Sequence, residues 1–328
     1  MPTRTKTSSA DIQRVLKHVR IRPGSKFRIA RHDTAWVPGD ALRPLEAKVI
    51  KDRAQEILRR NVAELADAQE LLWASDSHSV LVVFQAMDAA GKDGTIKHVA
   101  SGLNPTGCEV RSFKAPSIEE LDHTFLWRAM KAVPERGKIT IFNRSHYEDV
   151  LIVKVRPELL AKTKLPLGMR GVGEGGGGAD GEKFWKQRYD DINAFERHLV
   201  RNGTLILKFF LNVSKEEQGK RFHDRLSDPE KQWKFALADL DSRYRWDDYM
   251  TAYEDAINAT STPWAPWHII PADHKWVMRA MVSGILAGAI RGLDLAYPNL
   301  TAAQKRELVQ ARKRLEGDSR AEPRSRRD

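Results

Sequence analysis

The sequence predicts an α/β fold with a central parallel sheet of about five strands. The first observation is Val80–Phe84, a run of five apolar residues that is typical of a strand buried on both faces. The second is that similar runs recur along the chain, and segments with helical spacing of their apolar residues separate them. Strands that alternate with helices pair in parallel, so helices should cover both faces of the sheet.

The first half of the chain predicts an arm, a long helix and then three strands with their helices. Residues 1–9 are polar and terminal and are expected to be disordered. Residues 18–31 alternate basic and apolar residues without a helical period, which favours an irregular arm. Apolar spacing favours a helix over residues 42–73. After the strand Val80–Phe84, we expect helices over residues 95–100 and from the N-cap Ser117 to Lys131, and strands at Cys108–Phe113 and Lys138–Phe142.

The second half continues the alternation after a glycine-rich segment. Residues 171–181 read GVGEGGGGADG, which cannot pack a core and predicts a flexible loop, with a lid hinge as the alternative. Strands are expected at Thr204–Leu211 and Trp267–Pro271. Helices are expected at Phe184–Val200, at Lys215–Leu226 after the cap Ser214, at Asp239–Ala259, and from the cap Asp273 to about Leu295. The charged tail from Gly317 is expected to be disordered.

Composition excludes several classes of protein. A chain of 328 residues with 41% hydrophobic and 30% charged residues is ordinary for a globular protein. The single cysteine, Cys108, excludes a disulfide framework and a cysteine-rich metal site, and we expect it to be a small buried residue. The polar N-terminus predicts no signal peptide, and the apolar runs are too short for a membrane span, so a cytoplasmic protein is expected.

The net charge of +11 is concentrated at the two ends of the chain. Residues 1–60 carry a net charge of +9 and residues 301–328 a net charge of +4, whereas the 240 residues between them carry −2. The overall charge therefore says little about the core, where the placement of individual charges must decide.

The segment 79–95, SVLVVFQAMDAAGKDGT, indicates a phosphate-binding loop between a strand and a helix. Backbone N–H groups of such a loop and the helix N-terminus attract an anion, and Lys92 adds a positive charge. The motif departs from G-x-x-x-x-G-K-[ST], because Ala86 replaces the first glycine and Asp93 follows the lysine. Asp88 would repel a phosphate unless a cation lies between them. The alternative is a strand that ends in a plain turn, with Lys92 in solvent. The expected loop residues after Asp88 are Ala89, Ala90, Gly91, Lys92, Asp93, Gly94 and Thr95.

A polar cluster, Asn143–Glu148, follows the expected third strand. Ligands of parallel α/β sheets bind at the carboxyl ends of the strands, so this cluster and the phosphate-binding loop should lie together. Arg144 is placed to bind a phosphate through two N–H groups, with a peripheral ion pair as the alternative. The alternative for Asn143 is a simple turn residue after the strand.

Several longer segments together resemble the polyphosphate kinase type 2 family. They are QAMDAAGKDGTIKHV, NPTGCEV, SFKAPS, ELDHTFLWR, IFNRSHYEDVLIVKV, RYDDINAFERHLVRNGT, ILKFFLNVSKEEQGKRFHDRL, WKFA and TSTPWAPWHIIPADHKW. The resemblance spans roughly residues 20–295. It implies a three-layer α/β/α core of the P-loop kinase type with a helical lid, and reversible transfer of a terminal phosphate between inorganic polyphosphate and a nucleotide.

The resemblance also implies a division of the chain. We expect a basic arm and helix packed on the core at residues 1–75, a P-loop kinase-like catalytic domain at 76–297 with a lid at about 214–240, and a C-terminal helix with a disordered charged tail at 298–328.

The same resemblance implies roles for individual residues and a divalent cation, Mg²⁺ or alternatively Mn²⁺. Lys92 would neutralise the transferred phosphate, and Asp88 would position the metal or the acceptor phosphate. Asn143 stands where the family pattern usually has an acidic metal ligand, which shifts weight toward Asp88 and Glu148. Asn143 together with Glu148 looks like the class that accepts AMP as well as ADP.

The expected lid and the acceptor side supply further candidates. A polyphosphate chain carries about one negative charge per unit and is best held by a row of cations. The candidates for that row are Lys220, Arg221, Arg225, Lys231 and Lys234; the alternative is a solvated helix face paired with Glu217 and Asp224. Lys114, Asp122 and Arg128 are the candidates on the acceptor-nucleotide side. His123 is expected to be structural, because phosphoryl transfer needs charge and positioning more than proton abstraction.

The sequence suggests three functions. A polyphosphate-dependent nucleotide kinase fits best, an ATP-dependent nucleoside monophosphate kinase shares the same core, and a nucleic-acid-binding protein would need an RNA-binding motif that the core lacks. We therefore expect polyphosphate and nucleotides as substrates, no membrane and no specific nucleic acid as partner, and a homo-oligomer.

Overall fold

The computed structural model describes residues 9–38, 47–166 and 179–321. The five strands are β1 (Ser79–Gln85), β2 (Cys108–Ser112), β3 (Ile139–Asn143), β4 (Thr204–Asn212) and β5 (Trp267–Pro271). The first six α-helices are α1 (Ser9–Val19), α2 (Ala47–Ser75), α3 (Lys92–Val99), α4 (Ile118–Leu121), α5 (Trp127–Met130) and α6 (Ile152–Val155). They are followed by α7 (Ala179–Arg201), α8 (Lys215–Ser227), α9 (Leu237–Tyr244), α10 (Trp246–Thr260), α11 (Lys275–Arg291) and α12 (Ala302–Ala321).

The five strands form one parallel sheet in the order β2-β3-β1-β4-β5, which confirms the predicted fold class. β1 lies in the middle and all seven of its residues are buried, as its uninterrupted apolar run predicts. The register pairs Phe84 of β1 with Asn143 of β3. The carboxyl ends of β1 and β3 therefore lie side by side, as expected for the loops that follow them.

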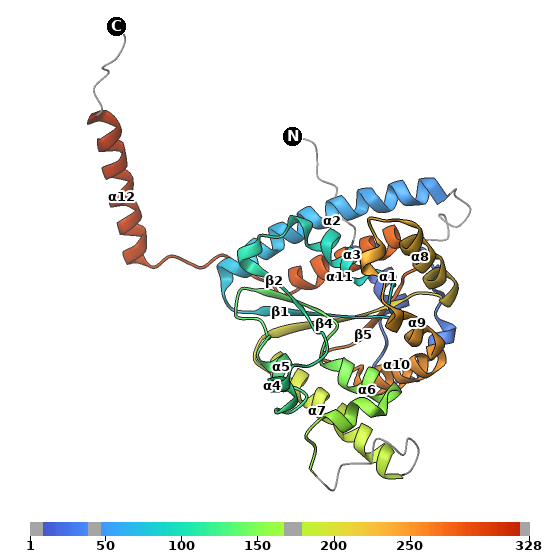
Figure 1. Cartoon of the computed structure of the whole chain (residues 1–328). Coiled ribbons are helices and arrows are strands. Elements are labelled where there is room, and N and C mark those ends of the chain that lie inside the picture. Colours follow the sequence, from blue (N-terminus) through green and yellow to red (C-terminus); the bar gives the residue numbers. More distant parts are fainter. Residues whose placement is uncertain (1–8, 39–46, 167–178, 322–328) are drawn as a thin grey trace.

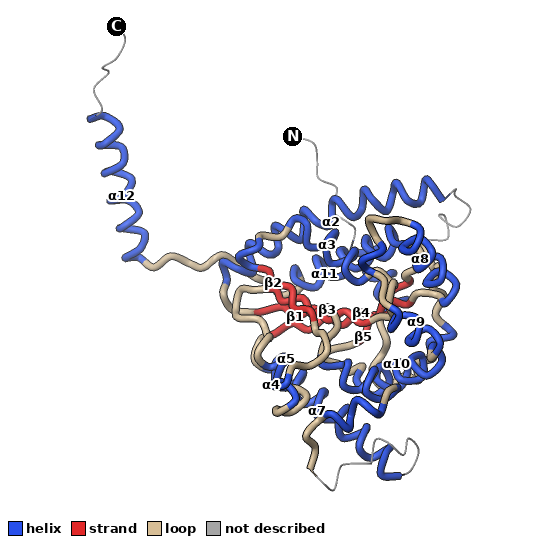
Figure 2. The backbone as a smooth tube through the Cα atoms, viewed as in Figure 1, coloured by secondary structure: helices blue, strands red, loops and turns tan. Residues whose placement is uncertain are grey.

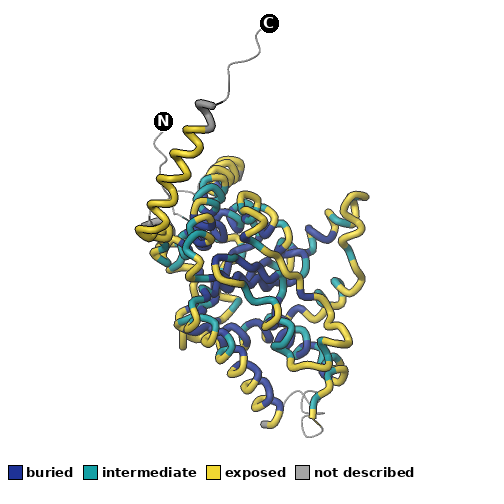
Figure 3. The backbone as a smooth tube through the Cα atoms, turned by 90° about the vertical axis from the view of Figure 1, so that its left-hand side faces the viewer, coloured by how far each residue is buried: buried dark blue, intermediate teal, exposed yellow. Residues whose placement is uncertain are grey.

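Helices cover both faces of the sheet and make three layers (Figure 1). α2, α3 and α11 lie on one face, and α5, α7 and α10 lie on the other (Figure 2). The buried residues gather at the sheet and at the helix faces turned toward it (Figure 3). Helices α8 and α9 stand at the edge of this core, in the region expected to form the lid.

Three of the expected helices differ in the structure. The helix expected from Ser117 to Lys131 is broken into α4 and α5, although Ser117 does form its capping box with Glu120. The helix expected over residues 239–259 is divided at Arg245, whose guanidinium donates to the Val155 carbonyl (2.8 Å). Asp273 is not a helix cap, because its carboxylate accepts from the Ser214 N–H (2.8 Å) and the Thr34 hydroxyl (2.7 Å).

The ends of the chain also differ from expectation. Residue 9 already belongs to α1, and α7 begins at Ala179, five residues before the expected start. α12 continues to Ala321, so the disorder expected from Gly317 is wrong for residues 317–321, although Gly317, Asp318 and Ser319 are weak helix formers. Disorder is also expected for residues 1–8 and 322–328, which lie outside the described residues. Most of the glycine-rich segment, residues 171–178, lies outside them as well.

α12 projects away from the body, and its residues 302–317 are exposed (Figures 1 and 3). Across the three described ranges, no helix combines the length and the apolarity that crossing a membrane would require.

Candidate active site

The loop between β1 and α3 has the backbone geometry of an anion-binding loop. Gly91 precedes the first residue of α3 and has a φ of 107°, which favours glycine. Ala89 has a φ of 59°, a conformation that costs a residue with a Cβ atom about 1 kcal/mol. The hydroxyl of Thr95 donates to the Gly91 carbonyl (2.9 Å) and ties the first turn of α3 to the loop.

All five consecutive carbonyl groups from Ala86 to Ala90 accept hydrogen bonds from side chains. Lys92 Nζ donates to Ala86 (2.7 Å) and Met87 (3.2 Å). Two residues of α8 hold the other three: Gln218 donates to Asp88 (3.0 Å), and Arg221 donates to Ala89 (3.1 Å) and Ala90 (2.7 Å). The carbonyl oxygens are thereby held by cations and amides, away from a bound phosphate.

Arg221 is buried, although its sequence position suggested an exposed lid cation. Its side chain is 4% exposed, and its second terminal nitrogen donates to the carbonyls of Ala272 (2.7 Å) and Asp273 (3.0 Å). Its Nε donates to Glu217 (2.8 Å). All five N–H groups of this guanidinium are therefore engaged by the protein. The expectation that Arg221 binds polyphosphate stays a prediction, and these contacts favour a different role.

Arg144, Asp88 and Glu148 come together at the mouth of the loop. Arg144 follows β3 and has a φ of 60°, a conformation that directs its side chain toward the loop after β1. Its guanidinium donates to the Asp88 carboxylate (3.0 Å). All three residues line a cavity of about 140 Å³, together with Tyr249 and Tyr253 of α10.

Burial and neighbouring charges oppose one another at this cluster. Burial raises the pKa of Glu148, although Arg144 and Lys92 act in the opposite direction. Burial lowers the pKa of Lys92, and the nearby Arg144 lowers it further. The Glu148 carboxylate is the main cause of a raised pKa at Arg144. A carboxylate that is costly to ionise beside a cation is a common feature of functional sites.

Asn143 contacts the phosphate-binding loop through its amide. Its Nδ2 donates to the Asp93 carboxylate (2.7 Å), a bond that joins the carboxyl end of β3 to the first turn of α3. This contact confirms that the loop and the cluster after β3 lie together. The amide nitrogen serves Asp93, so only the Oδ1 atom of Asn143 could face a metal ion.

Asp239 of α9 was not a candidate from the sequence, and it faces the same cavity. Burial raises its pKa, and the nearby Asp88 carboxylate raises it further. Arg225, one of the expected lid cations, lies 3.7 Å from Asp239. The other expected lid cations lie at the surface in ion pairs or on an aromatic ring: Lys220 with Glu216, Lys231 with Asp228, and Lys234 over Trp233.

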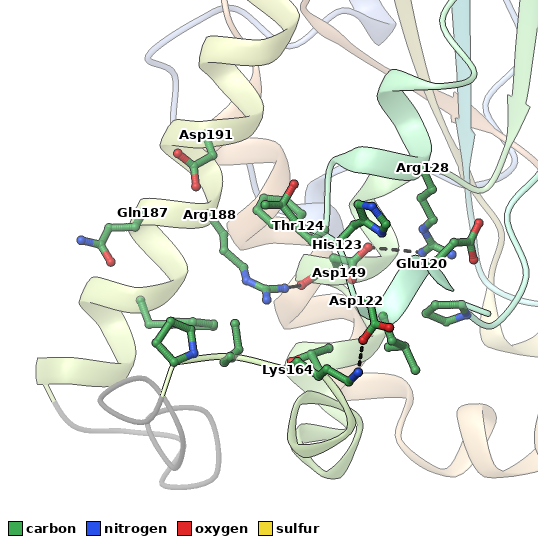
Figure 4. A pocket seen from close by; sticks show the side chains of 17 residues that line it. Glu120, Asp122, His123, Thr124, Arg128, Asp149, Lys164, Gln187, Arg188 and Asp191 are labelled. Carbon is green, nitrogen blue, oxygen red and sulfur yellow. Dashed lines mark hydrogen bonds and ion pairs between the residues drawn. The ribbon is translucent and has the colours of Figure 1, made fainter. Parts of the chain in front are cut away.

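A second cavity, of about 420 Å³, lies beyond Asp149 and is shown in Figure 4. Arg128 donates to the Asp149 carboxylate (3.2 Å) and to the Lys114 carbonyl (2.9 Å). From the opposite wall, Arg188 of α7 donates to the Asp149 carbonyl (2.8 Å). At the rim, Asp122 forms an ion pair with Lys164 (Figure 4). Asp122 and Arg128, two of the candidates for the acceptor side, thus line the same cavity.

Three other residues considered from the sequence, Lys114, His123 and Cys108, differ in their surroundings. Lys114 lines an adjacent cavity of about 400 Å³ together with Arg128. The His123 ring stacks on Trp127 at 3.9 Å, and its Nδ1 lies 2.8 Å from the Glu119 carbonyl, which fits the structural role expected for it. Cys108 is half-buried, and burial raises the pKa of its thiol to about 11.

Two groups of residues behind the site could not be read from the sequence. Arg188 lies against the rings of Phe125 and Phe184 in the middle of α7, and only its place on the apolar face of that helix could have indicated burial.

Lys208 of β4 is fully buried and donates to Glu196 (2.6 Å), the Tyr147 hydroxyl (2.9 Å) and the Thr260 carbonyl (2.8 Å). A lysine inside an apolar strand was the available signal. This group fixes Tyr147, the residue next to Glu148.

The donor set at the small cavity suits a divalent cation that also binds substrate. Asp88, Glu148 and Asp239 place three carboxylates around it. In the part of the chain that the structure describes, no three His, Cys, Asp or Glu side chains are close enough to form a complete metal site by themselves. Mg²⁺ commonly binds one or two carboxylates and completes its shell with water and substrate phosphates, so the arrangement fits that ion.

Comparison with known proteins gives a consistent result. Residues 48–166 and 178–296 match the family model described as Polyphosphate kinase 2 (PPK2). The ADP-polyphosphate phosphotransferase of Rhodopseudomonas palustris is 50% identical over 265 residues, which cover 81% of this chain and 89% of that protein. The AMP/ADP-polyphosphate phosphotransferase of Meiothermus ruber is 42% identical over 298 residues, covering 90% of this chain and 100% of that protein. The crystal structure of polyphosphate kinase 2 from Arthrobacter aurescens TC1 superposes with a TM-score of 0.75 at 38% identity and covers 89% of this chain and 95% of that one.

Proposed function

The chain belongs to the polyphosphate kinase 2 family, and from this premise we propose that its loop site transfers the terminal phosphate of inorganic polyphosphate to AMP and to ADP. It is a polyphosphate-dependent nucleotide kinase, a phosphotransferase, as its similarity to enzymes of that activity indicates. The observation that carries the assignment of residues is the convergence of Lys92, Arg144 and Asp88 at the carboxyl ends of β1 and β3.

Lys92 and Arg144 act on the phosphate that is transferred. An oxygen of the acceptor's terminal phosphate attacks the terminal phosphorus of polyphosphate, and the bond from that phosphorus to its bridging oxygen breaks. The shortened polyphosphate leaves with the bonding electrons. The acceptor oxygen is already ionised, so the step needs no strong base, and catalysis rests on charge and alignment. Lys92 leaves its two carbonyl partners to meet the phosphate oxygens.

Asp88 and Glu148 would hold Mg²⁺, or Mn²⁺, at the small cavity, with Asp239 as a further carboxylate beside it. The ion would supply positive charge that offsets the negative charge of the phosphates in the transfer step. A cation there also explains how two carboxylates are tolerated beside an anion-binding loop. The Oδ1 atom of Asn143 is the weaker candidate ligand, because an amide brings no charge.

The larger cavity suits the nucleoside of the acceptor. It lies on the side of β3 where Arg128 and Asp149 form a buried ion pair, and Asp122 at its rim offers a carboxylate to an exocyclic amine. Lys114, next to Arg128, would meet the acceptor phosphate. Polyphosphate would extend over the opposite side, along the lid cations Lys220, Arg225, Lys231 and Lys234.

The decisive assay leaves ATP out. Purified protein mixed with AMP, Mg²⁺ and long-chain polyphosphate should produce ADP and then ATP. Chromatography of the nucleotides measures both products over time. An ATP-dependent nucleoside monophosphate kinase would give no product until ATP is added. No product with polyphosphate, together with product from ATP and AMP, would refute the proposal.

A further inference from the structure

β2 presents an open edge of the sheet. It is the terminal strand in the described sheet order, and its residues Glu109–Ser112 are exposed, including the side chain of Val110 (45% exposed). Trp73, which is 49% exposed, lies beside Gly107 just before the strand begins. Apolar groups on an open strand edge are unusual in a monomer, because such an edge can pair with another chain.

The hydrogen bonds on the inner side show which backbone groups face outward. The Phe113 N–H donates to the Asn143 carbonyl of β3 (3.0 Å). Backbone groups alternate along a strand, so those of Glu109 and Arg111 also face β3. Those of Cys108, Val110 and Ser112 therefore face the open side, with Val110 in the middle.

The side chains on this edge complement themselves about that central residue. Glu109 and Arg111 flank Val110, point to the same face of the sheet and lie 2.7 Å apart in an ion pair. In an antiparallel pair of two β2 strands centred on Val110, Glu109 of each copy lies opposite the partner's Arg111. Opposite charges in facing positions stabilise a strand pair, and like charges destabilise it.

Other registers lack this complementarity. A shift of the centre to residue 109 would set Glu109 against the partner's Glu109, and a shift to residue 111 would set the two Arg111 side chains together. Only the register centred on Val110 pairs all five residues of the strand and matches the charges. In that register Val110 and the partner's Val110 exchange two backbone hydrogen bonds.

We propose that two copies of this chain associate through antiparallel pairing of their β2 strands about a two-fold axis at Val110, which joins their sheets into one. The proposal does not depend on the proposed function. A strand pair this short buries too little surface for a stable dimer by itself, so Trp73 is expected to contribute apolar area beside it. The alternative is that Glu109 and Arg111 are edge charges that keep the chain monomeric.

Charge exchange tests the register. Arg111→Glu should weaken the dimer about tenfold or more in sedimentation equilibrium, because each Glu109 would then face a glutamate of the partner. The double variant Glu109→Arg/Arg111→Glu restores opposite charges and should recover the wild-type dissociation constant. The proposal would be overturned if Arg111→Glu had the same dimer dissociation constant as wild type. It would also be overturned if the double variant dimerised as weakly as Arg111→Glu.

A proline and a cysteine provide independent tests. Val110→Pro removes an N–H that faces outward, so it should give monomers while the unfolding midpoint stays near that of wild type. In a Cys108→Ser background, Val110→Cys should form a disulfide between copies under mild oxidation, whereas Glu109→Cys should not, because it faces the partner's Arg111. A monomeric wild type, or a Val110→Pro variant that remains dimeric, would overturn the proposal.

Discussion

Replacing Arg221 by Ala should disable the enzyme by releasing the phosphate-binding loop, and it should also destabilise the fold. The substitution leaves four carbonyls, those of Ala89, Ala90, Ala272 and Asp273, without their donor in a site where the side chain is 4% exposed. At about 1 kcal/mol for each net hydrogen bond, the free energy of unfolding should fall by about 4 kcal/mol. Displacement of the loop by about 1 Å should lower kcat about 100-fold.

Arg225→Ala is the matched control, since Arg225 lies one turn further along α8. Its side chain is 24% exposed and makes a single ion pair at 3.7 Å, so its loss should cost less than about 1 kcal/mol of stability. We expect it to raise the KM for polyphosphate and to weaken the salt dependence of that KM, with kcat largely retained.

Urea unfolding and steady-state kinetics with varied polyphosphate separate the two roles. Arg221→Lys should recover little activity, because one ammonium cannot reach carbonyls on two sides. If Arg221→Ala instead unfolds like wild type, keeps its kcat and changes only the KM for polyphosphate, the clamp is refuted. The sequence-based expectation of a polyphosphate-binding arginine would then stand.

Three further outcomes are expected. Lys92→Ala should lower kcat by about 10²–10³-fold without loss of fold, measured by nucleotide chromatography and circular dichroism; near-native turnover would exclude Lys92 from the transfer step. Glu148→Asn should lower activity on AMP far more than on ADP, because a carboxylate can anchor a metal or water in place of the missing phosphate; equal losses on the two acceptors would contradict this role. Burial lowers the pKa of His268 from its ordinary value of 6.5 to about 4. Between pH 6.5 and pH 4 this imidazole is therefore protonated in the unfolded chain but neutral in the folded protein. Its stabilising contribution is therefore complete above pH 6.5 and falls by about 3 kcal/mol by pH 4. Urea unfolding at each pH should show that His268→Asn flattens the free energy of unfolding over this range, and an unchanged pH dependence would contradict this role.

Most of the sheet could be predicted because β1, β3, β4 and β5 are buried on both faces and are therefore largely apolar in sequence. β5 has the predicted bounds, Trp267–Pro271, and β4 differs by one residue. The positions of Asp88, Arg144 and Glu148 followed from the same logic, since the ends of parallel strands converge.

What could not be predicted depends on contacts between distant segments. The break at Arg245 follows from a carbonyl 90 positions away, and Asp273 caps no helix because it serves Thr34 and Ser214. Arg221 looks identical to Arg225 in the sequence, with the same helix, the same charge and one turn between them. Only the fold places one against the loop carbonyls and leaves the other facing Asp239.

The hydrogen bonds from side chains to the carbonyls of residues 86–90 also affect how many glycines the loop needs. A phosphate-binding loop that organises itself relies on glycine at several positions, and its chain has much conformational entropy to lose when the anion arrives. Here alanines stand at positions 86, 89 and 90, and the side chains of Gln218 and Arg221 hold the backbone path when Lys92 turns to the phosphate. The loop is ordered by its own protein, so the binding energy of the phosphate is not consumed in ordering it and remains for the transition state.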